Sequence, residues 1–402
     1  LQAEDHLGDN VALNFVRTAI DRRLPHVEIR LGSEIRMIRE QYDFDTRRKV
    51  VESEAGWRPE MWAQFAELGL LMAPFSEEDG GLGGGPIDAM VVMEEFGKGL
   101  VVEPYVPSVV CGGGFLKRGS DAQKEEYLSG IMSGEAIFAF AYAEPRGRYN
   151  LADLETTAKR DGAGFVLNGH KAVVIGAPWA THFIVTARTS GDRRDRNGVT
   201  VFVVAKDAQG VSTRDYPTVD GRRASEVYFE NVAVGAESVI GDVDNGLPLV
   251  ELVSDEAIAA LCAEACGAMK VAHDMTVEYS RQRKQFGVAI GKFQVLQHRM
   301  VDMFMEHEQS ISMTYMATLK LDEDEVTRKK AASAAKVRIG QAGRFVGQES
   351  IQIHGGMGMT DELAVGHYFK RLTIIDAEFG NVDHHLKRYT ALSEADLPAA
   401  AE

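Results

Sequence analysis

The chain has 402 residues and a mass of 44.1 kDa, with 45% apolar and 26% charged residues, which is ordinary for a folded protein of two or three domains. Its 60 acidic and 44 basic side chains give a formal net charge of −16, and a surface this acidic repels phosphate backbones and anionic lipid. Composition therefore argues against a disordered chain, and we expect neither nucleic acid nor a membrane surface as a general partner.

The uncharged stretches and the cysteines of the sequence indicate in which cellular compartment the protein is expected. The longest stretches without Asp, Glu, Lys or Arg run from Tyr105 to Leu116 and from Ala172 to Ala187, and both fall short of the about 20 residues that a spanning helix needs. Cys111, Cys262 and Cys266 are too few for a disulfide framework and lack zinc spacing. We expect no membrane-spanning segment, no secretory signal, buried cysteines in a reducing compartment, and a cytoplasmic location.

The first zone, from about Asn10 to Gly134, has helical periodicity. Apolar residues recur at intervals of three and four over Trp57 to Leu71 and again over Ile87 to Phe96, which predicts two amphipathic helices. The glycine-rich segment from Gly80 to Pro86 breaks the pattern and predicts a loop between them.

The second zone, from about Ile137 to Val239, consists of short β-rich runs between Gly, Asp and Asn turns. The expected strands are 165–167, 172–175, 183–186, 199–204 and 227–229. Asn168-Gly169 lies between the first two runs and predicts a hairpin there. Strands at this spacing predict a small antiparallel barrel or sandwich.

The third zone, from Leu247 onward, predicts long helices over 253–279, 293–319 and 326–353. Glycines at 355–358 break the pattern before a last helical stretch that starts at Ala364. Helices, then strands, then helices predict an α+β fold with segregated elements. The expected domains are an N-terminal helical domain (1–136), a middle antiparallel β-barrel (137–242) and a C-terminal helical bundle (243–402).

Motifs for several enzyme classes are absent from the sequence. It contains no dinucleotide fingerprint after a strand, no phosphate-binding P-loop, no H-E-x-x-H pair and no G-x-S-x-G elbow. His384 and His385 are adjacent, and side chains that are adjacent on a helix point about 100° apart, so they suit a structural or cofactor-edge role better than a metal.

The basic run from Arg281 to Gly287 stands out in this acidic chain. Cations at the end of a long helix suit its dipole, which is a purely structural explanation. A second explanation is a phosphate clamp, in which arginine grips pyrophosphate with its planar fork and Phe286 offers a stacking face. The run alone leaves both explanations open.

Several motifs together resemble the acyl-CoA dehydrogenase family. The ones in the third zone are R-K-Q-F-G at 283–287, I-G-K-F-Q at 290–294 and Q-I-H-G-G-M-G at 352–358. The ones in the second zone are Y-A-E-P at 142–145, L-N-G-H-K at 167–171 and V-Y-F-E-N-V at 227–232. The resemblance covers roughly residues 57–389, and the segments 261–265 and 379–385 are most similar to the small subunit of pimeloyl-CoA dehydrogenase.

The resemblance implies a cofactor, a substrate and partners. Members of this family combine an N-terminal helical domain, a β-barrel and a four-helix bundle, and they bind FAD between barrel and bundle with help from a second subunit. An acyl-CoA substrate, an electron-transfer flavoprotein and a homo- or hetero-oligomer, either a dimer or a tetramer, follow from it. The implied FAD-binding residues are Arg283, Phe286, Gln294, Gln352, Gly355, Gly356, Asn381, Asp383 and Ala143.

The family's catalytic base is missing from its expected place. Family members remove the α-proton of the thioester with a Glu carboxylate while the β-hydride passes to the flavin. The residue matching that Glu is Phe379, and the alternative family position is Ala257. Asp255, Glu256 and Glu378 are neighbouring carboxylates that could replace it.

The segment that would face the flavin also departs from the family. The run from Arg146 to Asn150 replaces the usual small residues, and Val173 and Ile175 replace a Trp and a Thr. Two main hypotheses remain. The chain is either a flavoenzyme subunit with a displaced base or, as we prefer, a base-less partner in a heteromeric acyl-CoA dehydrogenase. A purely structural FAD-edge subunit and a relative of flavin monooxygenases or nitroalkane oxidases are further alternatives.

Overall fold

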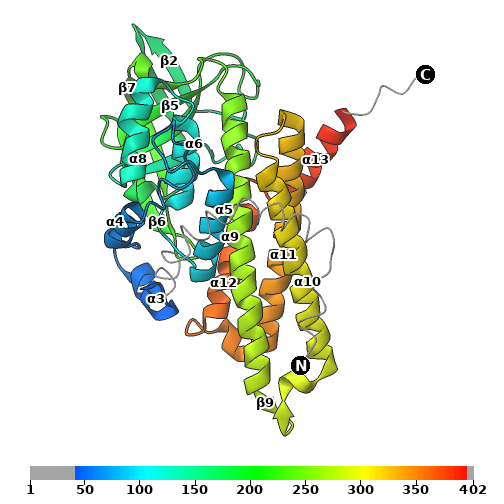
Figure 1. The fold of residues 1–402 in the computed structure, drawn as a ribbon. Helices are drawn as coiled ribbons and strands as arrows, with labels where there is room; N and C mark the ends of the chain where they lie inside the picture. Colours follow the sequence, from blue (N-terminus) through cyan, green and yellow to red (C-terminus); the bar gives the residue numbers. More distant parts are fainter. Residues whose placement is uncertain (1–40, 396–402) are drawn as a thin grey trace, which may run out of the picture.

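The computed structural model describes residues 41–395, whose elements form three regions in chain order (Figure 1). Short helices come first, a β-sheet region follows, and long helices then form a bundle that extends away from both. This order confirms the expected α+β class with segregated helices and strands. Over residues 41–395, no helix has both the length and the apolar character that a membrane span requires.

The N-terminal region packs its helices around large apolar side chains such as Phe65, Phe96 and Phe115. Its helices begin at recognisable signals: Asp43 caps α3 by accepting a hydrogen bond from the Thr46 amide at 2.8 Å, and both α4 and α5 start with proline. The helices of this region are α3 (Phe44–Glu52), α4 (Pro59–Glu67), α5 (Pro86–Gly99), η1 (Tyr105–Gly112), α6 (Gly113–Leu116), α7 (Asp121–Gln123), η2 (Lys124–Leu128) and α8 (Ser129–Ser133).

The middle region is an eight-stranded sheet in the order β6-β7-β3-β2-β4-β5-β8, with β1 beside β4. Its strands are β1 (Phe138–Ala141), β2 (Thr157–Asp161), β3 (Gly164–Ile175), β4 (His182–Arg188), β5 (Val199–Ala205), β6 (Val211–Pro217), β7 (Arg223–Val234) and β8 (Val239–Ile240), with the short helices η3 (Ala177–Trp179) and η4 (Ala236–Ser238) between them. The expected all-antiparallel pairing holds only in part, because β1 and β2 each run parallel to β4.

The hairpin predicted at Asn168-Gly169 is wrong. Both residues lie inside the continuous strand β3, and the turn between β2 and β3 falls at residues 162–163 instead. The pair marks a register shift against β7: the Asn168 carboxamide oxygen accepts a hydrogen bond from the Asn231 amide at 2.9 Å. A Cβ on Gly169 would lie 2.3 Å from the Thr156 hydroxyl, so this glycine permits close backbone approach at a bulge rather than a turn.

The C-terminal region is the helical bundle. Helix α9 contacts α10, α11 and α12, and α13 packs on α11. The predicted last helix is interrupted, because residues 378–381 form a turn between α12 and α13. The elements are α9 (Leu247–Gln282), β9 (Lys284–Gln285), β10 (Val288–Ala289), η5 (Ile290–Lys292), α10 (Gln294–Leu319), α11 (Glu325–His354), η6 (Gly355–Met359), α12 (Ala364–Ala377) and α13 (Val382–Ala395). All three cysteines are buried free thiols, as expected.

Two glycines bring the N-terminal region and the bundle into backbone contact. A Cβ on Gly97 of α5 would lie 1.9 Å from the Glu264 carbonyl oxygen of α9, and a Cβ on Gly267 of α9 would lie 1.9 Å from the Glu94 carbonyl oxygen of α5. These close approaches exclude any larger residue at either position. They fix α5 against the middle of α9.

A buried group of charges, which we call the Glu264 cluster, joins the β region to the bundle. It consists of Asp220 and Arg222 from the connection before β7, Glu264 of α9, Arg371 of α12, and Glu378 just after α12. The Arg371 guanidinium donates to both Glu264 carboxylate oxygens at 2.6 and 2.7 Å, and Arg222 donates to Glu264 at 2.6 Å. Arg371 also binds Asp220 at 2.9 Å and Glu378 at 2.5 Å. The cluster therefore connects three segments that are far apart in sequence.

Candidate functional site

Two neighbouring cavities lie where the β region meets the bundle. The first, which we call the apolar cavity, has a volume of about 370 Å³ and lies between η1, β1, β3 and the end of α12. Its walls include Val106, Cys111, Phe140 and Ile374, together with the small residue Ala143. A volume of this size is typical of sites that hold a planar organic molecule or part of a cofactor.

The second cavity, which we call the polar cavity, has a volume of about 220 Å³. Arg196, Arg388, Glu251, Ser254 and Asn150 contribute to its wall; Arg196 pairs with Glu251 at 2.8 Å and Arg388 pairs with Asp255 at 2.8 Å, so the wall offers paired charges and neutral hydrogen-bonding groups. Such a lining suits a ligand segment that carries amide, hydroxyl or anionic groups.

Three aromatic residues line both cavities: Tyr142, Tyr149 and Phe379. The rings of Tyr142 and Phe379 are stacked, with centroids 5.0 Å apart and planes inclined by 13°. Phe140 continues the stack at 4.8 Å from Tyr142. In the sequence Tyr142 belongs to the Y-A-E-P motif, and no pattern there predicts that it contacts Phe379.

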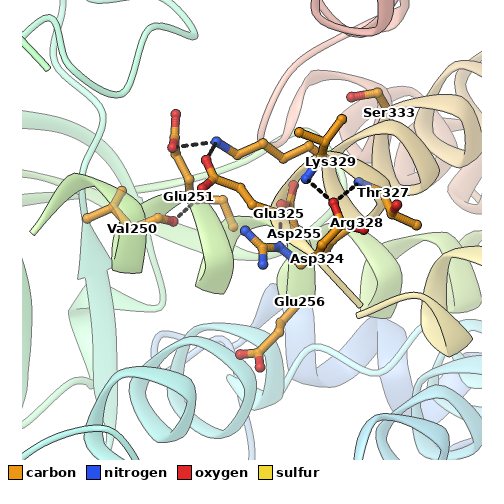
Figure 2. Close-up of polar contacts among 12 residues, drawn as sticks. Val250, Glu251, Asp255, Glu256, Asp324, Glu325, Thr327, Arg328, Lys329 and Ser333 are labelled. Atoms are coloured by element: carbon orange, nitrogen blue, oxygen red, sulfur yellow. Dashed lines mark hydrogen bonds and ion pairs between the residues drawn. The ribbon is translucent and has the colours of Figure 1, made fainter. Parts of the chain in front are cut away.

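Two of the carboxylates proposed as displaced bases, Asp255 and Glu256, are each held by two cations, and neither carboxylate lines a cavity. Asp255 is fully buried and pairs with Arg328 at 3.1 Å and with Arg388 at 2.8 Å. Glu256 points away from that group, as Figure 2 shows, and pairs with Lys117 at 3.0 Å and Arg118 at 2.8 Å.

These ion pairs determine the protonation of Glu256. Its burial alone would raise its pKa, but Lys117 and Arg118 more than offset this and hold the pKa below its usual range. A carboxylate held by two cations is a weaker proton acceptor. Neither Glu256 nor Asp255 lines either cavity.

Glu378, the third carboxylate candidate, does line the apolar cavity. Its carboxylate oxygen lies 2.5 Å from an Arg371 nitrogen, which makes it a member of the Glu264 cluster. It is therefore both near the cavity and held by a cation. Of the three candidates, it alone is placed to reach a ligand there.

Glu144, which lines the apolar cavity, forms a buried ion pair with Lys171; both belong to the predicted β motifs. The Lys171 ammonium donates to Glu144 at 2.7 Å and to the Thr186 hydroxyl at 3.1 Å. The Glu144 carboxylate also accepts hydrogen bonds from the amides of Glu155 and Thr156, at 2.6 and 3.1 Å. Every oxygen of this carboxylate is satisfied, so the pair positions the cavity wall rather than exchanging protons.

Buried side chains of α11 and α13 bind the backbone of the turn that carries Phe379. The Lys336 ammonium donates to the carbonyl oxygens of Ile375, Asp376 and Gly380 at 2.5, 3.0 and 2.9 Å. His385 contacts the Phe379 carbonyl oxygen at 3.1 Å through Nε2. No local pattern in the sequence marks Lys336 as a buried residue, because a lysine inside a helix is ordinarily exposed.

His384 and His385 act as structural residues of this turn. Among the described residues, no group of three or more His, Cys, Asp or Glu side chains is arranged to hold a metal ion. Burial, with Lys336 nearby, lowers the pKa of His385 to about 2, so its imidazole is neutral at physiological pH. The neutral ring can donate from Nε2 to Phe379 while Nδ1 accepts from the Ser333 hydroxyl at 3.2 Å.

The nine predicted FAD-binding residues divide into two groups. Ala143 lines the apolar cavity, and Asn381 and Asp383 begin α13 close to it. Asn381 caps that helix by accepting a hydrogen bond from the His384 amide at 3.0 Å. The other six residues lie at the opposite end of the bundle: Arg283, Phe286, Gln294, Gln352, Gly355 and Gly356.

The second group surrounds an exposed hairpin at the far end of α9 (β9 and β10, Figure 1). Phe286 is 92% exposed, with its backbone in the left-handed region at φ 53°, and its ring meets Phe293 edge-on. Tyr279 and His354 stack at 4.4 Å, which places the end of α11 beside the end of α9. The side chains of Arg283 and Lys284 are exposed and make no ion pair with any residue in 41–395.

The two groups are too far apart to serve one cofactor within one chain. Leu247, at the start of α9, lines the polar cavity, whereas Arg283 directly follows the end of this helix. The helix has 36 residues, which at 1.5 Å per residue separates its ends by about 54 Å. A single FAD that uses both groups must therefore lie between two chains.

A helical region, a β region and a bundle, with a ligand cavity where the last two meet, are the arrangement of FAD-dependent oxidoreductases that act on CH–CH groups. Comparison with known proteins identifies the family. Acyl-CoA dehydrogenase models match the N-terminal domain over residues 33–135, the middle domain over 139–232 and the C-terminal domain over 245–388. The chain belongs to the acyl-CoA dehydrogenase family.

Individual relatives agree with this assignment. The chain is 31% identical to the probable acyl-CoA dehydrogenase YngJ of Bacillus subtilis over 347 residues, which is 83% of this chain and 91% of YngJ. It resembles the structure of a variant of the Tcur3481–Tcur3483 steroid ACAD, with a TM-score of 0.83, 26% identity and coverage of 92% and 98% of the two chains. It also resembles PigA with FAD and proline, with a TM-score of 0.85, 25% identity and the same coverage.

Proposed function

We propose that this chain is an FAD-binding, base-less subunit of a heteromeric acyl-CoA dehydrogenase, of the subgroup that contains the pimeloyl-CoA dehydrogenase small subunit. The complex would remove an α-proton and a β-hydride from an acyl-CoA thioester and pass the electrons to an electron-transfer flavoprotein. The partner chain would supply the carboxylate that takes the proton.

One observation supports this proposal: Phe379, which matches the family's catalytic Glu in sequence, lines both cavities. A phenyl ring cannot take a proton, and the carboxylates on the cavity walls are all paired: Glu378 with Arg371, Glu144 with Lys171 and Glu251 with Arg196. Asp255 and Glu256 are ion-paired, and neither lines a cavity. The described residues therefore offer no unpaired carboxylate on either cavity wall.

The residues present fit FAD. The apolar cavity has the size and the flat aromatic walls that an isoalloxazine ring needs, and Ala143 and Ala172 leave backbone accessible beside it. At the far end of α9, an exposed phenylalanine and unpaired cations on a chain of net charge −16 suit an adenosine pyrophosphate.

Each group of residues would then have a distinct part in the reaction. When bound, FAD supplies the acceptor for the β-hydride. Arg283 would bind the pyrophosphate of a neighbouring chain's cofactor, and Phe286 would stack on its adenine. The apolar cavity would keep water from the ring, while Arg196 and Arg388 of the polar cavity would bind polar groups of the thioester.

The separation of about 54 Å between the two groups supports an oligomer, either a dimer or a tetramer. The missing base supports a heteromer over a homomer. The two-part name of the relative Tcur3481–Tcur3483 agrees with such an assembly.

The test is to purify the chain alone and together with the products of neighbouring genes, and to record flavin absorbance during anaerobic titration with saturated acyl-CoA thioesters. We expect bound flavin in both preparations and bleaching only in the complex. Bleaching of the isolated chain at the rate of the complex would overturn the proposal.

Glu378 supports a second candidate function, an enzyme with a displaced base, because it lines the apolar cavity. If the isolated chain does reduce its flavin, Glu378→Gln should slow that step by about 10²–10⁴-fold while FAD stays bound. The matched control is Glu230→Gln, at an exposed position of β7.

A further inference from the structure

Two buried ion pairs lie at the wall of the apolar cavity with their anionic members on the cavity side. Glu144 pairs with Lys171 at 2.7 Å, Glu378 pairs with Arg371 at 2.5 Å, and both glutamates belong to the wall. Neither Lys171 nor Arg371 lines the cavity, and the side chains of both are almost completely buried. In each pair the anionic residue therefore lies on the wall and the cationic residue lies behind it.

The other ionisable residues of this wall do not offset the two carboxylates. Burial raises the pKa of Cys111, Tyr142 and Tyr149, so these three acids are neutral at physiological pH. Arg148 is a cation of the same wall, but it is exposed, and salt and water screen an exposed charge. The charge that acts inside the cavity is therefore negative.

The charge of Glu378 reaches other parts of the cavity wall. Burial raises the pKa of Tyr142, and the Glu378 carboxylate raises it further. The same carboxylate contributes, after burial and Glu256, to the raised pKa of the Cys111 thiol on η1. Both effects have one cause, because a fixed negative charge opposes the appearance of a second one in a space of low dielectric constant.

We propose that Glu378, together with Glu144, makes the apolar cavity negative in electrostatic potential and so lowers the two-electron reduction potential of a flavin bound there. This inference rests on the proposed function, because it takes the apolar cavity as the flavin side. Reduction adds two electrons and one proton to the ring, so the net charge of the ring becomes one unit more negative. A carboxylate on the wall opposes that change and favours the oxidised ring.

A lowered potential gives this chain a direction of electron flow. Its flavin accepts electrons from a substrate less readily and gives them up more readily to an acceptor. Such a flavin suits a subunit without a base, because the site then favours transfer outward to the proposed electron-transfer flavoprotein over capture of a hydride.

The expected size of the effect follows from Coulomb's law. At an effective dielectric constant of about 20, a unit charge about 10 Å from another changes an equilibrium roughly tenfold. Glu378 lines the cavity, so a ring held there should lie within this range of its charge. Glu378→Gln should therefore raise the ratio of reduced to oxidised flavin at a fixed potential by about tenfold, which is about 30 mV for a two-electron couple. Arg371 keeps Glu264 and Asp220 as partners in this variant, so its guanidinium should stay in place.

The experiment is slow anaerobic reduction of the flavin-loaded, full-length chain by xanthine and xanthine oxidase at pH 8, beside a dye of known potential. The absorbances of flavin and dye give the ratio of reduced to oxidised flavin at each potential. Glu378→Asp keeps the charge and should stay within threefold of the wild type. Glu378→Ala removes it, should match Glu378→Gln, and serves if the glutamine variant loses its flavin. Glu230→Gln, at an exposed position of β7, is the matched control and should behave as the wild type.

The outcomes separate the two proposals. A rise of less than threefold in Glu378→Gln, or a fall, would overturn the electrostatic role of Glu378. Equal shifts in the glutamine and aspartate variants would also overturn it, because they would point to the shape of the side chain and not to its charge. Either result leaves the base-less function standing, since the potential is measured at equilibrium without an acyl-CoA. Bleaching of the isolated wild-type chain by an acyl-CoA at the rate of the complex would instead overturn the proposed function, whatever the potential.

Discussion

Removing the charge of Glu264 tests whether the buried cluster holds the β region against the bundle. This carboxylate is fully buried and accepts three hydrogen bonds of 2.6–2.7 Å from Arg222 and Arg371. Glu264→Gln keeps the shape and removes the charge. Arg371 retains the anions Asp220 and Glu378, whereas Arg222 loses the anion Glu264, its ion-pair partner among the described residues, and keeps neutral acceptors such as the Val101 carbonyl oxygen at 3.2 Å.

The expected magnitude follows from that asymmetry. Breaking a buried ion pair by removing one partner typically costs about 3–5 kcal/mol, because a charge is left without compensation. Since one arginine here keeps its other partners, we expect the lower end, about 3 kcal/mol of unfolding free energy. Burial alone would raise the Glu264 pKa, but Arg222 and Arg371 more than offset this and hold it below the usual range. The stabilisation is therefore fully present above about pH 4.5 and is lost as the pH falls through the lowered pKa.

The assay is urea unfolding at pH 7 followed by circular dichroism, with exposed Glu230→Gln as the control, for which we expect a change within about 0.5 kcal/mol. A double variant, Glu264→Leu with Arg222→Met, should recover much of the loss, because it removes both charges together. A Glu264→Gln protein within about 1 kcal/mol of the wild type would refute the assigned role of the cluster.

Three further predictions concern the cofactor, the turn and the base. Arg283→Ala should weaken flavin binding by about 10–150-fold, the equivalent of a charge-assisted contact of about 1.5–3 kcal/mol, and unchanged affinity in a flavin titration would contradict the clamp. The pKa of His385 is about 2 in the folded protein and about 6.5 when unfolded, so the unfolded chain gains a proton first as the pH falls. Acidification from pH 7 to 5 should therefore lower the unfolding free energy of the wild type by about 2 kcal/mol more than that of His385→Asn. Equal losses of the two proteins in urea unfolding would contradict this. Phe379→Glu should give the isolated chain slow flavin bleaching with an acyl-CoA, and an inactive variant beside a fully active wild type would place the base elsewhere.

The helices and most strands could be predicted from the sequence because their periodicity is local. The fold class, the α4–α5 loop and the burial of the cysteines follow from such patterns. The Asn168-Gly169 hairpin failed because the dipeptide that favours a turn can also form a bulge, and only the pairing of β3 with β7 decides between them.

The candidate site was harder to predict because its groups meet only through tertiary contacts. Glu256 and Asp255 are adjacent in sequence, yet they point to different cations on different elements. Lys336 lies more than 35 residues from the carbonyl groups it binds, and no local pattern marks a lysine as buried. The roles of the nine FAD-binding candidates stay predictions. The structure places three of them near the start of α9 and six near its end.

The length of α9 has a consequence for how the protein responds to dilution. A cofactor contacted at both ends of such a helix belongs to the assembly rather than to one chain, so its retention is linked to the association equilibrium by mass action. Flavin loss on dilution should then depend on protein concentration, and free FAD should in turn drive the chains together. In a cell, the supply of flavin would thus help to set how many assembled complexes exist.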